Sequence, residues 1–131
     1  MNKEDKELLL RDLSARLPYG VKVLCLRDST RKWYSLERVN AGDSEVYLTT
    51  KTFGSYLNRY VAIETVKPYL FPMSSMTEEQ KREYQYITER WMYDPSYSIS
   101  DSIDWLNKNC FDYRGLIPQE LAIDATGLNI Y

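Results

Sequence analysis

Few residues of this chain have the type and spacing that catalysis requires. The 131-residue sequence contains no histidine, which excludes His-based triads, His metal sites and His pH switches. It also lacks the glycine-rich dinucleotide loop, the P-loop, HExxH and the EF-hand pattern. Asp101, Asp104 and Asp112 come closest to a cluster that could bind a hard cation or work as acid and base. Asp101 and Asp104 also fit the start of a helix, where a carboxylate caps free backbone N–H groups, and we expect this structural role for them. With no other catalytic pattern in the sequence, we expect a non-enzymatic chain with no catalytic residue, metal or cofactor.

The only two cysteines, Cys25 and Cys110, are expected to be packing residues. Cys25 lies in an apolar run, and Cys110 lies near the end of an expected helix, where the dipole does not favour a thiolate. Without histidine or a CxxC spacing they do not form a zinc site. We expect both thiols to be reduced, with a disulfide between them as the alternative.

The charges are distributed unevenly along the chain. The net formal charge is -2, so the whole chain is no generic polyanion binder. Residues 1–70 carry a net +3 and residues 71–131 a net -5, which indicates either a basic contact surface or two parts that dock and neutralise each other. The start, MNKEDKELLLRDL, does not resemble a signal peptide, and no stretch approaches the roughly 20 apolar residues of a membrane span. We therefore expect a cytoplasmic protein without membrane contact.

Basic residues and a tryptophan gather around the first expected hairpin. The candidate nucleic-acid contacts are Arg27, Arg31, Lys32, Trp33 and Arg38. Cations beside an exposed ring supply the phosphate neutralisation and stacking that single-stranded nucleic acid needs. Hairpin tips are ordinarily charged, however, and acidic neighbours dilute this patch. Nucleic-acid binding by a small β-barrel is therefore the alternative function.

The 12 tyrosines favour protein binding as the leading function. Tyrosine offers a large contact area with few rotatable bonds and is enriched at interfaces. Tyr93 and Tyr97 flank Pro95 in an expected loop, and Tyr113 and Arg114 lie in a later turn. These four form the candidate protein interface, and the partner is an unknown protein or a second copy of the chain.

The apolar periodicity predicts an α+β fold in one domain, 1–131. It has an N-terminal helical subregion (1–18), a β subregion (20–70) and a helical subregion (74–131). The expected strands are 21–26, 33–39, 45–50 and 59–66, in a small curled antiparallel sheet that could close into an SH3-like barrel. Asn2 is expected to cap the N-terminal helix. The expected later helices run from 77 to 91, from 100 to 109 and over 116–123. The first of these has two possible capping boxes, Ser75 with Glu78 and Thr77 with Gln80, and it carries Tyr84, Ile87 and Trp91 on its apolar face. Pro68 places the end of the last strand at an edge or a bulge of the sheet.

Four stretches together resemble a family of short hypothetical proteins from gut Bacteroidales, some of them carried on phages or other mobile elements. The stretches are LPYGVKV (17–23), KPYL (67–70), SSMTEE (74–79) and DWLNKNCFDYRGLI (104–117). The resemblance spans nearly the whole chain, with 26–65 as its most variable part, and it carries no catalytic residues. Its members often have histidine where Cys110 stands, which argues against an essential thiol there. It implies a cytoplasmic accessory protein of a prokaryote or its mobile element.

The segment 111–115 within the last stretch has two interpretations. As a structural corner, Gly115 would adopt a positive φ, and Asp112 would accept from nearby backbone N–H groups or pair with Arg114. As a functional loop, its Asp-Tyr-Arg side chains would be exposed for recognition. We expect the corner.

Overall fold

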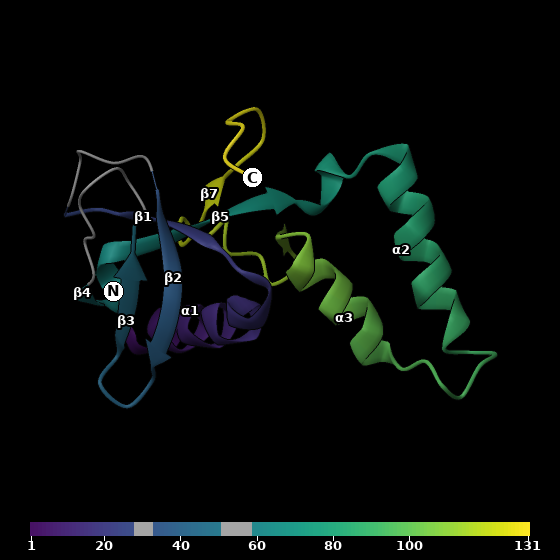
Figure 1. Ribbon diagram of the computed structural model, residues 1–131, viewed down its shortest axis with the longest axis horizontal. Coiled ribbons are helices and arrows are strands. Elements are labelled where there is room, and N and C mark those ends of the chain that lie inside the picture. Colours follow the sequence, from purple (N-terminus) through teal and green to yellow (C-terminus); the bar gives the residue numbers. More distant parts are fainter. Residues whose placement is uncertain (28–32, 51–58) are drawn as a thin grey trace.

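The chain forms a helix, a sheet and then two further helices, which confirms the α+β class (Figure 1). The structure is a computed structural model and describes residues 1–27, 33–50 and 59–131. The helices are α1 (Lys3–Arg16), α2 (Glu78–Arg90) and α3 (Ile99–Lys108), with single 3-10 turns at Leu17–Tyr19, Ile63–Thr65 and Met73–Ser75. The strands are β1 (Lys22–Cys25), β2 (Tyr34–Asn40), β3 (Glu45–Thr49), β4 (Arg59–Ala62), β5 (Val66–Pro72), β6 (Phe111–Asp112) and β7 (Ile123–Asp124).

The described strands form an open mixed sheet. Their order is β4-β3-β2-β1-β5-β6, and β7 also pairs with β5. The pairs among β1 to β5 are antiparallel, as expected, whereas β6 and β7 run parallel to β5. The expected antiparallel pairing thus holds for β1 to β5, but the described sheet as a whole is mixed and does not close into the SH3-like barrel that was possible.

Pro68 lies within a paired strand, so the prediction of a strand ending at an edge there is also wrong. The expected strand 59–66 is divided by a 3-10 turn, and β5 begins at Val66. The Leu26 N–H donates to the Thr65 carbonyl at 2.7 Å. Hydrogen-bonded and non-hydrogen-bonded residue pairs alternate along an antiparallel ladder. Since Leu26 and Thr65 form a hydrogen-bonded pair, Val23 and Pro68, three positions along, form a non-hydrogen-bonded pair. The missing proline N–H therefore costs no bond to β1, and β7 pairs with β5 only beyond it.

The Tyr131 hydroxyl bridges β1 and β5 at the next position of this ladder. The Lys22 N–H donates to it at 2.9 Å, and it donates to the Tyr69 carbonyl at 2.8 Å. Burial raises the pKa of Tyr131 well above its usual value. The end of the chain is thereby attached to the middle of the sheet.

Replacing Tyr131 by phenylalanine should lower the free energy of unfolding by about 1–2 kcal/mol, because both bonds are lost while the ring is kept. Urea denaturation measures the change. Tyr93→Phe, at a side chain that is 85% exposed, is the matched control and should have no measurable effect. Equal stabilities of Tyr131→Phe and the unchanged protein would contradict the bridging role.

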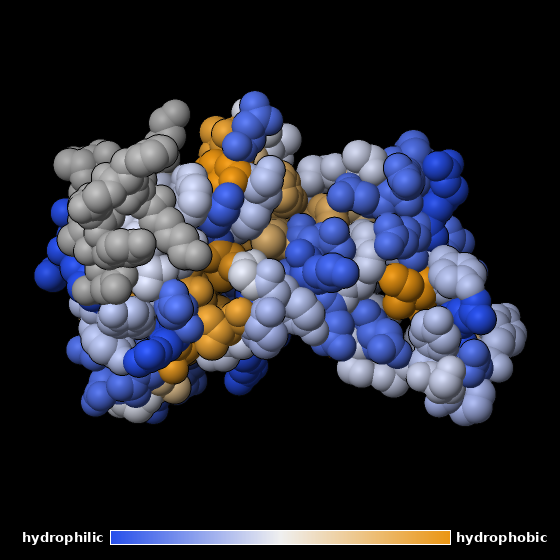
Figure 2. All heavy atoms as spheres, viewed as in Figure 1, coloured by the Kyte–Doolittle hydropathy of each residue, from blue (hydrophilic) through white to orange (hydrophobic). Residues whose placement is uncertain are grey.

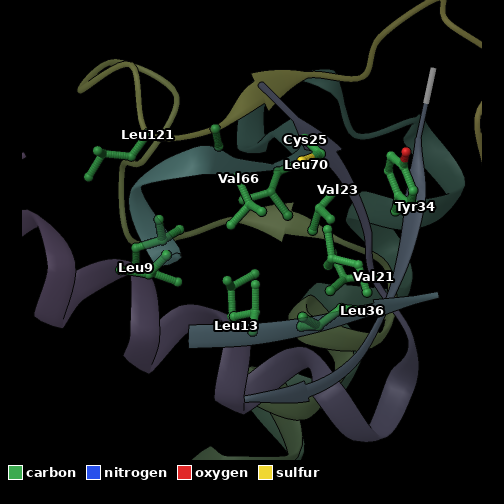
Figure 3. Close-up of a cluster of buried hydrophobic side chains, with 14 of the residues drawn as sticks. Leu9, Leu13, Val21, Val23, Cys25, Tyr34, Leu36, Val66, Leu70 and Leu121 are labelled. Atoms are coloured by element: carbon green, nitrogen blue, oxygen red, sulfur yellow. The ribbon is translucent and has the colours of Figure 1, made fainter. Parts of the chain in front are cut away.

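Helix α1 covers one face of the sheet and supplies part of the main core. The Asn2 side chain accepts from the Asp5 N–H at 2.7 Å and caps the helix, as predicted. Leu9 and Leu13 point from α1 toward buried residues of the sheet such as Val23 (Figure 3). All three side chains are fully buried.

A buried ion pair ties α1 to the C-terminal part of the chain. Asp12 and Arg16 are both fully buried and pair at 2.8 Å. Arg16 Nη2 also donates to the Phe111 carbonyl at 2.7 Å, and Arg114 Nη1 donates to Asp12 at 2.9 Å. Because a buried charge is costly unless it is paired, these contacts position Phe111 and Arg114 against α1.

The segment after α3 forms the expected structural corner. The buried Asp112 carboxylate accepts from the N–H groups of Leu116 and Ile117 at 2.9 and 2.8 Å. Gly115 has a φ of 75°, which a residue with a Cβ rarely adopts. Arg114 pairs with Asp12 rather than with Asp112. The expected helix over 116–123 is wrong, because Asp112 holds its first N–H groups in a turn and the segment ends in β7.

Candidate functional site

Helices α2 and α3 form an arm (78–108) that extends from the sheet and α1 (Figure 1). None of the residues of α2 is buried. Its Tyr84 and Ile87 pack on a small second core of Trp105, Leu106 and Phe111. The rings of Tyr84 and Trp105 lie 5.5 Å apart, and Trp105 stacks on Phe111 at 5.6 Å. The arm is therefore attached at its base and has little support at its far end.

Local hydrogen bonds determine where α2 begins. Thr77 and Gln80 form the predicted capping box: the Thr77 hydroxyl accepts from the Gln80 N–H at 3.1 Å, and the Gln80 side chain accepts from the Thr77 N–H at 2.9 Å. The alternative box of Ser75 and Glu78 is not used, since the Ser75 hydroxyl donates to the Pro72 carbonyl instead.

The loop between the helices is also held by side chains. Asp94 accepts from the Ser96 hydroxyl and backbone N–H, and these bonds lower the pKa of Asp94. The Asp101 carboxylate accepts from the Ser98 N–H at 2.6 Å, where α3 begins. These bonds fix the backbone of the loop between α2 and α3.

Five large apolar side chains are exposed within residues 86–99 at the far end of the arm, a segment that we call the arm tip. They are Tyr86 (54% exposed), Trp91 (40%), Met92 (63%), Tyr93 (85%) and Ile99 (63%). Single exposed apolar residues are ordinary, but a gathered set marks an interaction surface. In Figure 2 this end of the molecule, at the lower right, is mostly pale rather than the deep blue of charged surface.

A shallow hollow of about 280 Å³ lies on the arm tip, lined by Tyr86, Glu89, Arg90 and Tyr93. The Arg90 guanidinium lies 5.0 Å from the centre of the Tyr86 ring and 5.2 Å from that of Tyr97. Such cation–π contacts orient the rings without burying them. The hollow is slightly smaller than the usual small-molecule pocket, which measures about 300–1,000 Å³.

The structure separates the four residues of the predicted protein interface. Tyr93 and Tyr97 lie on the arm tip. Tyr113 instead donates its hydroxyl to Asn107 at 2.8 Å, and the Arg114 side chain is only 19% exposed where it pairs with Asp12. Tyr113 and Arg114 therefore make contacts within the chain, in the corner.

Tyr86, Arg90, Met92 and Ile99 also belong to the arm tip and are absent from the sequence prediction. A helical projection could have indicated Tyr86 and Arg90, which fall off the apolar stripe of Tyr84 and Ile87. Trp91, expected on that stripe, is the C-cap of α2 and keeps helical backbone angles, yet it is 40% exposed. The small core on which Tyr84 and Ile87 pack does not extend to it.

Those predicted nucleic-acid contacts that lie among the described residues are not brought together in one cluster. Arg31 and Lys32 lie outside the described residues, and Arg27 is exposed. Trp33 precedes β2, and the Lys22 ammonium lies over its ring, 4.1 Å from the ring centre. Arg38 lies toward the other end of β2, 5.3 Å from the ring of Tyr47.

A row of aromatic residues continues from Arg38 across the sheet. The register places Arg38 opposite Tyr47, and Tyr47 opposite Tyr60. The two rings lie 4.8 Å apart, and Tyr60 is 48% exposed. No local sequence pattern predicts this row, because it depends on the bulge in β2 at Glu37.

The acidic residues considered for metal binding each have a different structural role. Asp101 accepts from the N–H of Ser98, the N-cap of α3, in a capping box, and Asp112 holds the corner. Asp104 lies beside the Tyr19 hydroxyl, whose pKa is raised by desolvation and by this carboxylate. Among residues 1–27, 33–50 and 59–131, no three His, Cys, Asp or Glu side chains are grouped so that they could hold a metal ion.

Cys25 and Cys110 are both free and buried, so they do not form the alternative disulfide. Burial raises the pKa of the Cys110 thiol. We expect both thiols in the folded chain to react with Ellman's reagent on the order of a hundredfold more slowly than in the unfolded chain, because access requires local opening. Cys25→Ser assigns the two rates, and rapid labelling of either folded thiol would contradict this prediction.

Comparison with known proteins finds no matching family model, no matching curated protein and no matching solved structure. In the part of the chain that the structure describes, no helix is long and apolar enough to cross a membrane.

Proposed function

We propose that this chain is a non-enzymatic protein-interaction module that binds its partner through the arm tip. The observation that supports this most directly is the set of five large apolar side chains exposed there. They lie at the end of an arm in which α2 buries none of its residues. Leaving such side chains in water costs free energy that a partner would recover by covering them.

The composition of the arm tip fits a binding hot spot. Tyrosine, tryptophan and arginine are the residues that most often dominate binding energy. Here two tyrosine rings flank Arg90, and a third tyrosine, Tyr93, projects beside them. A partner that fills the adjacent hollow would desolvate the rings and Arg90 together. This arrangement favours specific binding over non-specific hydrophobic association.

We place this activity in a reducing compartment, the cytoplasm of a prokaryote. The two free, buried cysteines support that placement, because paired cysteines are typical of oxidising compartments. The resemblance to proteins of gut Bacteroidales and their mobile elements indicates where a partner should be sought.

Affinity capture from the native host tests the proposal. The unchanged chain should retain a specific protein, and Trp91→Ala combined with Tyr93→Ala should weaken its binding about 30-fold or more, as loss of hot-spot residues does. Tyr60→Ala, which removes a half-exposed tyrosine from the sheet, should retain the protein. Capture that survives the double variant but is lost with Tyr60→Ala would refute the arm tip as the binding surface.

We propose nucleic-acid binding as the second candidate function, favoured by the row of Arg38, Tyr47 and Tyr60. A cation beside two neighbouring aromatic rings, here tilted by 58° to each other, is suited to a single strand. Fluorescence anisotropy of a labelled single-stranded oligonucleotide at about 50 mM salt tests it. Arg38→Ala with Tyr60→Ala should weaken binding about tenfold or more, whereas Lys81→Ala with Arg82→Ala on the arm should not. Absence of binding by the unchanged chain would remove this candidate.

A further inference from the structure

The arm tip carries both a projecting side chain and a hollow that could receive one. Tyr93 is 85% exposed, the largest exposed fraction among the large apolar residues described. It also forms one wall of the 280 Å³ hollow, with Tyr86, Glu89 and Arg90. A projection and a hollow on the same small surface are what a two-fold interface requires, because each copy then inserts into the other and the assembly closes.

The charges of the arm tip also permit two copies to meet. Residues 86–99 contain two acidic residues and one basic residue, Glu89, Asp94 and Arg90. Asp94 and Arg90 already lie 4.0 Å apart within the chain. A strongly charged surface would repel its own copy, whereas here the net charge is only -1. Glu89 and Arg90 are adjacent in the sequence and both line the hollow. A two-fold axis that passes close to both would place Glu89 of one copy near Arg90 of the other.

The exposed apolar area is sufficient for a weak dimer. An aromatic side chain offers roughly 150–250 Å². At their exposed fractions, the five side chains present on the order of 600 Å² per copy. Two copies would bury about 1,200 Å², the lower end of the range for specific interfaces. An interface of this size is compatible with micromolar dissociation constants.

We infer that the partner of the arm tip is a second copy of this chain, with each Tyr93 inserted into the hollow of the other copy about a two-fold axis. This inference rests on the proposed function and specifies its partner.

Sedimentation of the full chain over about 5–500 µM tests the inference. The weight-average mass should rise from 15.5 kDa toward twice that value. Tyr93→Ala should raise the dissociation constant about tenfold or more. This variant should fold normally, since residue 93 follows the last turn of α2 and is exposed. Tyr60→Ala is the matched control and should dimerise like the unchanged chain.

Two charge variants test the two-fold arrangement separately. Glu89→Arg and Arg90→Glu should each weaken dimerisation, because each places like charges across the axis. An equimolar mixture of the two chains should associate more strongly than either alone, since the opposite charges then meet again. A mixture that is no stronger than its components would overturn the arrangement.

Failure of the inference can be distinguished from failure of the proposed function. If the chain stays at 15.5 kDa throughout the range while Tyr93→Ala abolishes capture of a different protein, the second copy is the wrong partner and the arm tip is still the binding surface. If dimerisation occurs but depends on Tyr60 and not on Tyr93, both the inference and the proposed surface are refuted.

Discussion

Replacing Asp12 by alanine is expected to lower the free energy of unfolding by about 3–5 kcal/mol. The carboxylate is fully buried and accepts from Arg16 Nε at 2.8 Å, from Arg16 Nη2 at 3.0 Å and from Arg114 Nη1 at 2.9 Å. Without it, the fully buried Arg16 would have no countercharge, and its Nη1 already has no hydrogen-bond partner among the described residues. The guanidinium cannot lose its proton to escape this cost.

Denaturation in urea measures this effect, and Glu7→Ala provides the control on the same helix. Glu7 pairs with Lys3 at 4.0 Å in an ion pair of the same spacing, but both of its side chains are exposed. Its loss should change stability by less than about 0.5 kcal/mol. If Asp12→Ala is as mild as Glu7→Ala, the ion pair does not anchor the corner to α1.

Replacing Trp105 by alanine is expected to cost about 3–5 kcal/mol and to detach the arm. Trp105 is 8% exposed and lies between Tyr84 of α2 and Phe111 of β6. Because α2 buries none of its residues, loss of this ring removes a large part of the apolar surface on which α2 packs. The arm should then open more readily than the sheet does.

Urea denaturation and limited proteolysis with trypsin distinguish these two effects. In Trp105→Ala, cleavage at Lys81, Arg82 and Arg90 should become faster while the sheet stays protected. Ile103→Ala, at a 38% exposed position of the same helix, should cost less than about 1 kcal/mol and leave the cleavage rate unchanged. An arm that stays protected in Trp105→Ala would show that other contacts attach it.

Local sequence signals predicted the elements but not all of their pairing. The cap at Asn2, the capping box of Thr77 and the alternation in β1 and β3 depend on neighbouring residues, so they could be recognised. The parallel strands β6 and β7 contain two residues each and show no periodicity. Their pairing with β5 depends on long-range contacts such as that of Arg16 with the Phe111 carbonyl, which no local pattern reveals.

The candidate site could be predicted only where a break in the chain indicated exposure. Tyr93 and Tyr97 flank Pro95, which gave a reason to expect a loop. Tyr113 and Arg114 also lie in a turn, but this turn packs against α1, and the sequence of a turn does not show what lies beside it. The exposure of Tyr86 depends on α2 being covered on only one side, which is a property of the assembled arm.

Photo-crosslinking in the native host tests most directly whether the arm tip is the binding surface. A p-benzoylphenylalanine residue at position 93 should give a discrete crosslinked product, whose mass identifies a second copy or another protein. The same residue at position 60, on the exposed face of the sheet, should give none. A product from position 60 and none from position 93 would contradict the account.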